Sequence, residues 1–322
     1  MGKIDTETKA FMSDPSHFAD AFNYLIYDGQ PVIKPEDLKP LDTAEIAIPY
    51  GNNARVPQQK YRDVLKLLSV MHDHEAIYAV LGVENQASIH YAMPVRNMHY
   101  DASNYVQQVQ AARKSYGKED RLTKAEFLSG FRKGDKLMPV ITLVIYFGSS
   151  EWDGPIRIHE MLNTNNEQLL SFVPDYRINL IAPAQMPDED FEKFTTDFRD
   201  VLQYIKYSRD RESLSRLTED NERFLRMNPE TAELINLITD SKLELNEEEG
   251  KVNMCQAIQQ MREQSKAAGK AEGKAEGKVE GRMETYAELV EAGMIDVRYV
   301  ASQLGMTAEE FLQETGITIP KS

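Results

Sequence analysis

The residues best suited to metal chemistry are two carboxylates and an amide in two neighbouring apolar runs. Glu84 and Gln86 close the run from Ala76 to Gln86, and side chains two residues apart in a strand point the same way. Asp63 belongs to the preceding run, from Tyr61 to Val70. If these runs pair as a hairpin, the carboxylate of Asp63 lies beside that of Glu84, because opposed Cβ atoms are about 5 Å apart.

Two carboxylates at that distance repel each other unless a cation binds between them. Mg²⁺, or Mn²⁺, prefers oxygen ligands, and Mg²⁺ is commonly held by one or two carboxylates with water and substrate phosphate. We predict that the ligands are Asp63, Glu84 and the backbone carbonyl of Asn85, so that the metal activates a bound water and stabilises charge on a phosphate. Gln86 would orient the water or a phosphate oxygen, but it lacks the positive charge of a lysine.

Each of these residues also has a simpler structural explanation. Glu84, next to buried aliphatic side chains, could form a salt bridge with Arg62 or Arg96. Asp63 could be a surface residue of its strand, and Gln86 could satisfy a turn amide. The spacing alone therefore leaves both a metal site and ordinary packing open.

The elements that must position these residues are a mixture of helices and strands. His17 to Asp28 has helical periodicity, and Pro94 suits the first turn of a long helix from Tyr91 to Lys114. One side of this long helix is apolar: Val95, Met98, Ala102, Tyr105, Val106 and Val109. Two further strands and two helical stretches follow: Met138 to Phe147, Tyr176 to Ile181, about Asp188 to Tyr207 and about Arg211 to Thr239. This order predicts an α/β fold, a mixed sheet flanked by helices and followed by a helical C-terminal region.

Several of these stretches resemble one family. YRDVLKLL, from Tyr61, and YAVLGVENQASIHYAMPVRNMHYDASNYVQQV, from Tyr78, resemble the recombination-promoting nuclease family, whose members are also labelled putative transposases. HFADAFNYLIYDG and LMPVITLVIYFG match the layout of that family, so the resemblance runs from about Ser16 to Tyr207. The family is similar to the PD-(D/E)xK phosphodiesterases. The resemblance implies a restriction-endonuclease-like core and Mg²⁺-dependent cleavage of DNA that promotes recombination.

The family pattern is Asp on one strand and Glu-x-Gln on the next, which maps onto Asp63, Glu84 and Gln86 as catalytic residues. The wider superfamily usually has Lys at the position of Gln86, whereas the recombination-promoting family commonly has Gln. Loss of that cation puts the rate of cleavage in question.

Four other residues are candidates for supporting roles. Arg96 and Tyr100 are four residues apart and share a face early in the long helix, where they could contact phosphate or orient Glu84. Arg62, in the same run as the strand aspartate, is a further candidate for contact with DNA. Asp20 of the first helix could join the site, as an acidic residue of the first helix does in some related nucleases.

The C-terminal part contains four tandem repeats, GKAE, GKAE, GKVE and GRME, between Gly269 and Glu284. They form either a solvated linker or a helix whose glycine stripe lets a second helix approach, with complementary charge stripes, which would make the protein a homo-oligomer. The segment MIDVRYVASQLGMTAEEFLQ predicts two short helices. We divide the chain into a nuclease-like domain, a helical region, a repeat helix or linker and a small helical end: residues 1–208, 209–264, 265–285 and 286–322.

Charge and composition set limits on function. The net charge of −15 argues against a molecule coated in nucleic-acid-binding surface, but residues 51–150 hold 13 Lys+Arg against 9 Asp+Glu, and the remainder holds 24 against 43. One segment could therefore bind the phosphate backbone of DNA. Cys255 is the only cysteine, which excludes an intramolecular disulfide. No apolar run suits a membrane span or a secretory signal, so we expect no membrane partner and a cytoplasmic location.

These observations together predict an Mg²⁺-dependent DNA endonuclease. The alternatives are a catalytically weak DNA-binding accessory protein of recombination and an oligomeric scaffold organised by the C-terminal repeats.

Overall fold

The computed structural model describes residues 2–41, 44–47, 58–61, 63–72, 75–117, 121–219 and 221–317. The chain forms two compact units, Met1–Gln256 and Ala257–Ser322. The first unit contains the predicted sheet and all of the predicted site residues.

The first unit is built around a mixed five-stranded sheet in the order β1-β4-β5-β6-β7. Its strands are β1 (Leu38–Pro40), β4 (Val64–His72), β5 (Glu75–Gln86), β6 (Val140–Tyr146) and β7 (Asn179–Ile181). The pairs β1–β4 and β4–β5 are antiparallel, whereas β5–β6 and β6–β7 are parallel. Helices flank this sheet, so the predicted α/β fold with a mixed sheet is confirmed.

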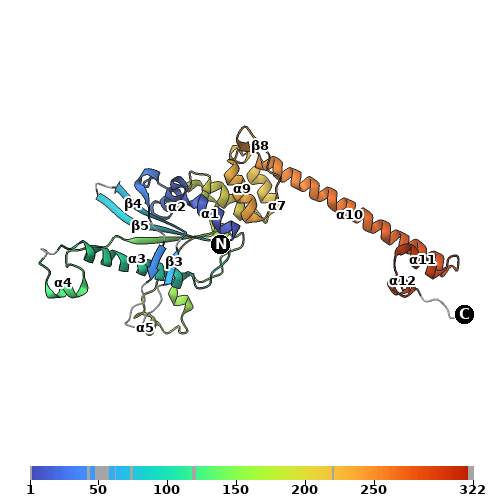
Figure 1. Ribbon diagram of the computed structural model, residues 1–322. Helices are drawn as coiled ribbons and strands as arrows, with labels where there is room; N and C mark the ends of the chain where they lie inside the picture. Colours follow the sequence, from blue (N-terminus) through green and yellow to red (C-terminus); the bar gives the residue numbers. More distant parts are fainter. Residues whose placement is uncertain are drawn as a thin grey trace. The chain divides into compact units, whose positions relative to one another are not determined.

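Helices cover both faces of the sheet (Figure 1), with α1 (Lys3–Ser13) and α2 (Pro15–Tyr27) on one face and α3 (Met93–Ser115) on the other. Alternation along β4 explains this division. Leu65 packs with Val80 and Val140 against Tyr105 of α3. The next residue, Lys66, points the other way, and its Nζ donates a hydrogen bond to the last carbonyl of α1, that of Ser13, at 2.8 Å.

The predicted helix at His17 is confirmed as α2. Asp14 caps its N-terminus by accepting a hydrogen bond from the backbone N–H of Ser16 at 2.7 Å, and Pro15 occupies the first turn, where no donor is lost. Phe18 and Phe22, one turn apart, are both fully buried, with ring centroids 4.9 Å apart. The apolar periodicity of this segment therefore corresponds to its packing.

The long helix α3 turns a polar face towards the sheet. Asn97, Asp101 and Asn104 are buried, whereas Val95 and Met98 of the apolar side are exposed. Hydroxyl groups from distant parts of the chain compensate for this burial, because those of Thr142 and Tyr176 both donate to the carboxylate of Asp101 at 2.6 Å. Of the apolar side, only Tyr105 packs in the core around Val80.

Other boundaries differ from the predicted ones. The run predicted as one strand from Tyr61 belongs to two strands, because Tyr61 is the last residue of β3 (Gln58–Tyr61) and β4 begins at Val64. The helical stretch predicted from Asp188 is a 3₁₀ helix followed, after a break, by α6, and the stretch from Arg211 is three separate helices. The remaining elements of the first unit are η1 (Pro35–Asp37), β2 (Ala44–Ala47), β3 (Gln58–Tyr61), α4 (Lys124–Ser129), η2 (Ile158–Met161), α5 (Glu167–Leu170), η3 (Pro183–Gln185), η4 (Asp188–Lys193), α6 (Phe198–Tyr207), α7 (Arg211–Thr218), α8 (Glu222–Leu225), α9 (Pro229–Thr239), β8 (Glu247–Glu248) and β9 (Lys251–Val252).

The second unit is helical. All four Gly-Lys-x-Glu repeats lie inside α10 (Met254–Glu291), so the repeat segment is a helix rather than an irregular linker. The two predicted short helices are α11 (Val297–Leu304) and α12 (Ala308–Thr315). They share a small core of Val290, Val300, Ala301 and Phe311. Within the described ranges, no helix is long and apolar enough to cross a membrane.

Candidate active site

Asp63 lies immediately before β4 and closes the pairing between β4 and β5. Val64 pairs with Val83. If this antiparallel register is continued by one residue on each strand, Asp63 lies opposite Glu84. The carboxylate of Asp63 accepts a hydrogen bond from the backbone N–H of Asn85 at 2.7 Å. Burial raises the pKa of the Asp63 carboxyl, although the bond from Asn85 and the charge of Arg96 favour its ionised form.

Glu84 is completely buried on the face of β5 that α3 covers. Its carboxylate forms an ion pair with Arg96, at 3.0 Å from Nη2. Nε of the same guanidinium donates to the hydroxyl of Tyr100 at 3.0 Å. The pKa of Tyr100 is raised, first by burial and then by the nearby charge of Glu84. Arg96 thus pairs with the buried acid from the first turn of α3, and Tyr100, one turn later, accepts a hydrogen bond from Arg96 within the field of Glu84.

The side chain of Gln86 turns back towards its own backbone. Its Nε2 donates to the carbonyl oxygen of Asn85 at 2.9 Å. That carbonyl was predicted to be a metal ligand, and a carbonyl oxygen has two lone pairs, so this bond alone does not prevent it from binding a cation. Gln86 therefore orients a backbone acceptor of the site.

A cleft of about 410 Å³ opens at this end of β5. Its walls are Asp5, Asp63, Asn85, Gln86, Ala87, Ser88, Ile89, His90 and Arg96. Four of the predicted residues therefore line one cleft: Asp63, Asn85, Gln86 and Arg96. Glu84 lies beneath this cleft and forms its ion pair with Arg96. The cleft is the natural place for a substrate of the predicted site.

Two of the lining residues that were not predicted, Asp5 and His90, carry titratable side chains. Asp5 comes from α1, 58 positions before Asp63, and no local pattern indicates that it reaches the sheet. Its carboxylate also accepts a hydrogen bond from the backbone N–H of Gly2 at 3.1 Å. His90 follows Gln86 by only four residues in the loop to α3, so its nearness in sequence could have indicated it.

Two candidates are not placed at the cleft. Asp20 is buried elsewhere, where the backbone N–H groups and hydroxyls of Thr195 and Thr196 all donate to its carboxylate. Asp20 therefore links α2 to the segment before α6. This structural role corrects the expectation that Asp20 joins the site. Arg62 lies outside the described residues.

The oxygen donors at the cleft suit a hard cation in number and kind. Two carboxylates and one carbonyl, from Asp63, Glu84 and Asn85, are the protein ligands that Mg²⁺ takes when water and substrate phosphate complete its shell. The part of the chain that the structure describes has no cluster of three or more His, Cys, Asp or Glu side chains suited to a metal. Arg96 supplies the positive charge next to Glu84 in this arrangement, so a metal would share that carboxylate with the guanidinium.

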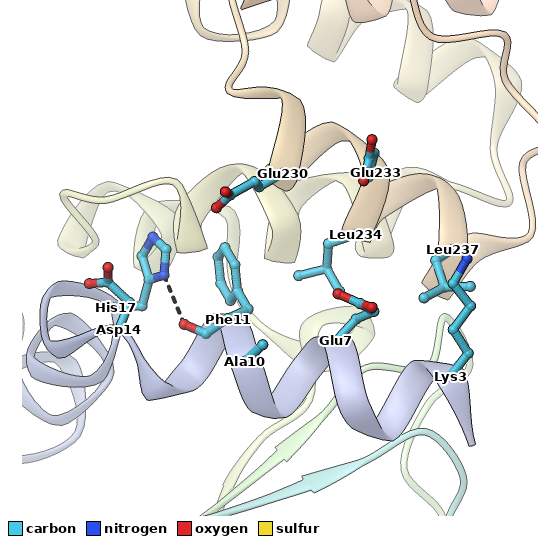
Figure 2. A pocket seen from close by; sticks show the side chains of 10 residues that line it. All are labelled: Lys3, Glu7, Ala10, Phe11, Asp14, His17, Glu230, Glu233, Leu234 and Leu237. Carbon is cyan, nitrogen blue, oxygen red and sulfur yellow. Dashed lines mark hydrogen bonds between the residues drawn. The ribbon is translucent and has the colours of Figure 1, made fainter. Parts of the chain in front are cut away.

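A larger hollow, of about 560 Å³, lies between α1 and α9 (Figure 2). Its rim is charged and its floor includes Phe11 and Leu234. The only imidazole drawn there, that of His17, stacks on Phe11 at 3.9 Å and donates from Nδ1 to the carbonyl of the same residue. None of the predicted site residues lines this hollow, so the smaller cleft remains the candidate site.

The fold and the cleft define an α/β protein with acidic side chains gathered where the antiparallel and parallel parts of a mixed sheet meet. The chain belongs to the family described as "Putative transposase, YhgA-like", whose model matches residues 55–236. The matched range contains Asp63, Glu84, Gln86, Arg96 and Tyr100, and it confirms the suspected putative transposase family. Neither a curated protein nor a solved structure matches the chain.

Proposed function

We propose that this protein is an Mg²⁺-dependent DNA endonuclease whose cuts promote recombination. The observation that carries the proposal is the convergence of Asp63, buried Glu84 and Arg96 at one cleft within the range that the transposase family model matches. A carboxyl with a raised pKa beside a buried acid and a cation is typical of catalytic sites. Membership of a transposase family is consistent with chemistry on DNA.

The roles of the residues follow from their contacts. Asp63, Glu84 and the Asn85 carbonyl would hold Mg²⁺ or Mn²⁺, which when bound supplies an activated water and neutralises charge on the phosphate. Gln86 keeps the Asn85 carbonyl oriented through its 2.9 Å hydrogen bond. Arg96 lines the cleft and can bind a phosphate oxygen while still paired with Glu84.

One observation favours a second candidate, a DNA-binding accessory protein that cuts slowly. The guanidinium of Arg96 already compensates the charge of Glu84, which weakens the demand for a metal there. Gln86, where the wider superfamily has Lys, adds no positive charge to the cleft. Both features would lower turnover without affecting DNA binding.

The test is nicking of supercoiled plasmid by the full-length protein with and without Mg²⁺. We expect nicking only with the metal, and a loss of at least about 100-fold in Glu84→Gln and Asp63→Asn, because each substitution removes a ligand charge. A matched control is Asp101→Asn, a buried acid of the same helix–sheet interface that is held by hydroxyls of Thr142 and Tyr176.

The control should nick at the rate of the wild-type protein. Binding of plasmid without any nicking, by protein of verified fold and in either Mg²⁺ or Mn²⁺, would reject the endonuclease and leave the accessory role. Equal nicking by the wild-type protein and Glu84→Gln would remove the cleft from the mechanism.

We also propose that the chain self-associates through the repeats of α10. A Cβ added to Gly269, Gly273, Gly277 or Gly281 meets no atom of the described chain within 4 Å, so packing within the chain does not require glycine there. On a helix that turns about 100° per residue, the Lys and Glu stripes flank the Gly stripe on opposite sides. Two parallel helices related by a twofold axis would then place Lys against Glu across the glycines.

A further inference from the structure

The excess of positive charge in the central part of the chain is concentrated in residues 113–136. This segment runs from the last residues of α3 towards β6, and we call it the excursion. Residues 113–136 hold eight Lys+Arg and four Asp+Glu, a net charge of +4. Of the chain's 37 basic and 52 acidic residues, the remainder then holds 29 and 48, a net charge of −19. A polyanion approaching this protein would therefore be attracted mainly to this excursion.

The basic side chains of the excursion are available to a ligand. Six described ones are exposed: Arg113, Lys114, Arg121, Lys124, Lys133 and Lys136. None of these six forms an ion pair with an acidic side chain in the described ranges, in contrast to Arg157, Lys193 and Arg199 elsewhere on the first unit. No acidic side chain of the described residues therefore offsets their charges through an ion pair.

The carboxylates of the two described acidic residues of the excursion accept hydrogen bonds from backbone N–H groups of the same segment. Glu126 accepts hydrogen bonds from the backbone N–H groups of Thr123 at 2.9 Å and Lys133 at 3.2 Å. Asp135 accepts from the N–H of Arg132 at 2.9 Å and from the hydroxyl of Tyr116. These bonds lower the pKa values of both carboxyls and hold them within the loop structure. The outer surface is left basic.

The described residues 121–136 of the excursion are anchored to the end of α3. Gly130 ends α4 with a φ of 68° and packs so closely on Arg113 that a Cβ there would lie 2.8 Å from its Cδ. The guanidinium of Arg132 stacks over the ring of Tyr116 at 4.3 Å. The excursion thus has a fixed position beyond the C-terminal end of the helix that carries Arg96 (Figure 1).

Two large apolar side chains project from the same surface. Phe127 is 71 % exposed and Leu128 is 84 % exposed, both on α4. Exposed side chains of this kind cost free energy in water and suit contact with sugars or base edges in a DNA groove. Their position among unpaired cations combines a phosphate-binding surface with an apolar contact.

We infer that residues 113–117 and 121–136 form a second DNA-contacting surface of this protein, in which the cations bind duplex phosphates and Phe127 with Leu128 contacts the groove. This inference rests on the proposed function, because it takes DNA as the ligand of the cleft. It adds a surface separate from the cleft that would determine affinity and placement of the duplex rather than the chemical step.

The experiment measures binding of the full-length protein to a labelled duplex of about 30 base pairs by fluorescence anisotropy, without divalent metal, over about 50–300 mM salt. The test variant is the triple substitution Lys124→Ala, Lys133→Ala and Lys136→Ala. We expect at least about 30-fold weaker binding at about 100 mM salt and a fall of about 2 to 3 in the slope of log K against log salt. Phe127→Ala with Leu128→Ala should weaken binding while leaving the slope unchanged.

The matched control neutralises three exposed lysines elsewhere on the first unit, Lys34, Lys39 and Lys242, so the net charge changes equally. Equal affinity and slope in the test and control variants would overturn the inference, even if the wild-type protein nicks plasmid. A selective loss in the test variant supports it even if no nicking occurs, so the two proposals can fail separately. Absence of duplex binding, with vesicles of anionic lipid bound through the same lysines, would also overturn it.

Discussion

Two buried acid–arginine pairs among the described residues of the first unit differ in their surroundings. Glu84 pairs with Arg96 at 3.0 Å below the cleft, and Asp200 accepts a hydrogen bond from Arg223 Nε at 2.7 Å in the helical layer. Both acids are almost fully inaccessible to solvent. Arg223 also donates a hydrogen bond from Nη2 to the carbonyl of Thr196 at 2.8 Å. Arg96 instead lines a hollow that also contains Asp63.

The comparison shows that a buried charge pair is not evidence of chemistry by itself. Burial raises the pKa of Asp200 just as it raises the pKa of Asp63, so the direction of the shift does not distinguish the two regions. The distinction is a cleft that brings a second carboxylate and a backbone carbonyl next to the pair. Arg96 lines this cleft, which leaves room for a ligand, whereas Arg223, although its side chain is 37 % exposed, also donates to the carbonyl of Thr196.

The largest expected effect is a loss of stability when either arginine is replaced, and the response to Mg²⁺ should distinguish the two variants. Arg223→Met and Arg96→Met should each lower the free energy of unfolding by about 3 kcal/mol, because each leaves a buried carboxylate without its counter-charge. Added Mg²⁺ should restore stability to Arg96→Met only, since only Glu84 lies next to a cleft that a cation can enter. Thermal melts with and without Mg²⁺ measure this, and equal responses of the two variants would remove the distinction between the pairs.

A somewhat smaller effect is expected at Asp20, which resembles the structural pair rather than the site. Asp20→Ala removes the acceptor for the donors of Thr195 and Thr196 and should cost about 2 to 3 kcal/mol in urea denaturation. Plasmid nicking measured well below the unfolding transition should stay at the wild-type rate. A nicking defect in folded Asp20→Ala would return this residue to the mechanism.

A pH-dependent effect should distinguish Asp63. Its pKa is raised above the ordinary value of 3.8, so the folded protein binds this proton more tightly than the unfolded chain does. The resulting stabilisation is complete below the unfolded pKa and is lost as the pH rises through the folded one. Asp63→Asn should therefore be more stable than the wild-type protein at about pH 7 and equal to it at about pH 3.

Urea titrations at the two pH values test this prediction. Mg²⁺ at about pH 7 should reduce the advantage of Asp63→Asn, because it stabilises the ionised carboxylate. The opposite order of stability at neutral pH would show that the bond from the Asn85 N–H outweighs the effect of burial.

The smallest effect on the first unit is expected from the repeats. Replacing the four repeat glycines by alanine should favour the helix by about 1 kcal/mol per residue and leave nicking by each cleft unchanged. If the glycines allow close approach of a second chain, light scattering will show a lower mass for this variant than for the wild-type protein. An unchanged mass with increased helicity would argue against self-association through the glycine stripe.

The sequence predicted those parts of the fold whose determinants are local. The helix around Phe18 and the strands ending at Gln86 and Tyr146 were found from periodicity and β-branched composition, because the same residues both set the pattern and fill the core. The polar inner face of α3 could not be found this way. Its acceptor, Asp101, is satisfied by Thr142 and Tyr176, which are 41 and 75 positions away.

The candidate site shows the same limit. Asp63 and Glu84 were indicated together because a hairpin is a local structure whose register can be anticipated. Asp5 and Asp20 are both acidic residues of N-terminal helices. No residue near them in sequence indicates that Asp5 lines the cleft, or that Asp20 accepts hydrogen bonds from Thr195 and Thr196. Their roles depend on packing between distant elements.

The helix α3 also fixes a length. Arg96 at the cleft and Arg113 at the basic excursion are 17 residues apart on one continuous helix, a separation of about 25 Å at 1.5 Å per residue. Stacked base pairs rise about 3.4 Å each, so this separation corresponds to roughly seven of them. If the proposed endonuclease binds DNA at both places, an oligonucleotide that extends less than this distance from the cleft would reach Arg96 but not Arg113. The length of α3 would therefore determine the shortest DNA that can contact both arginines at once.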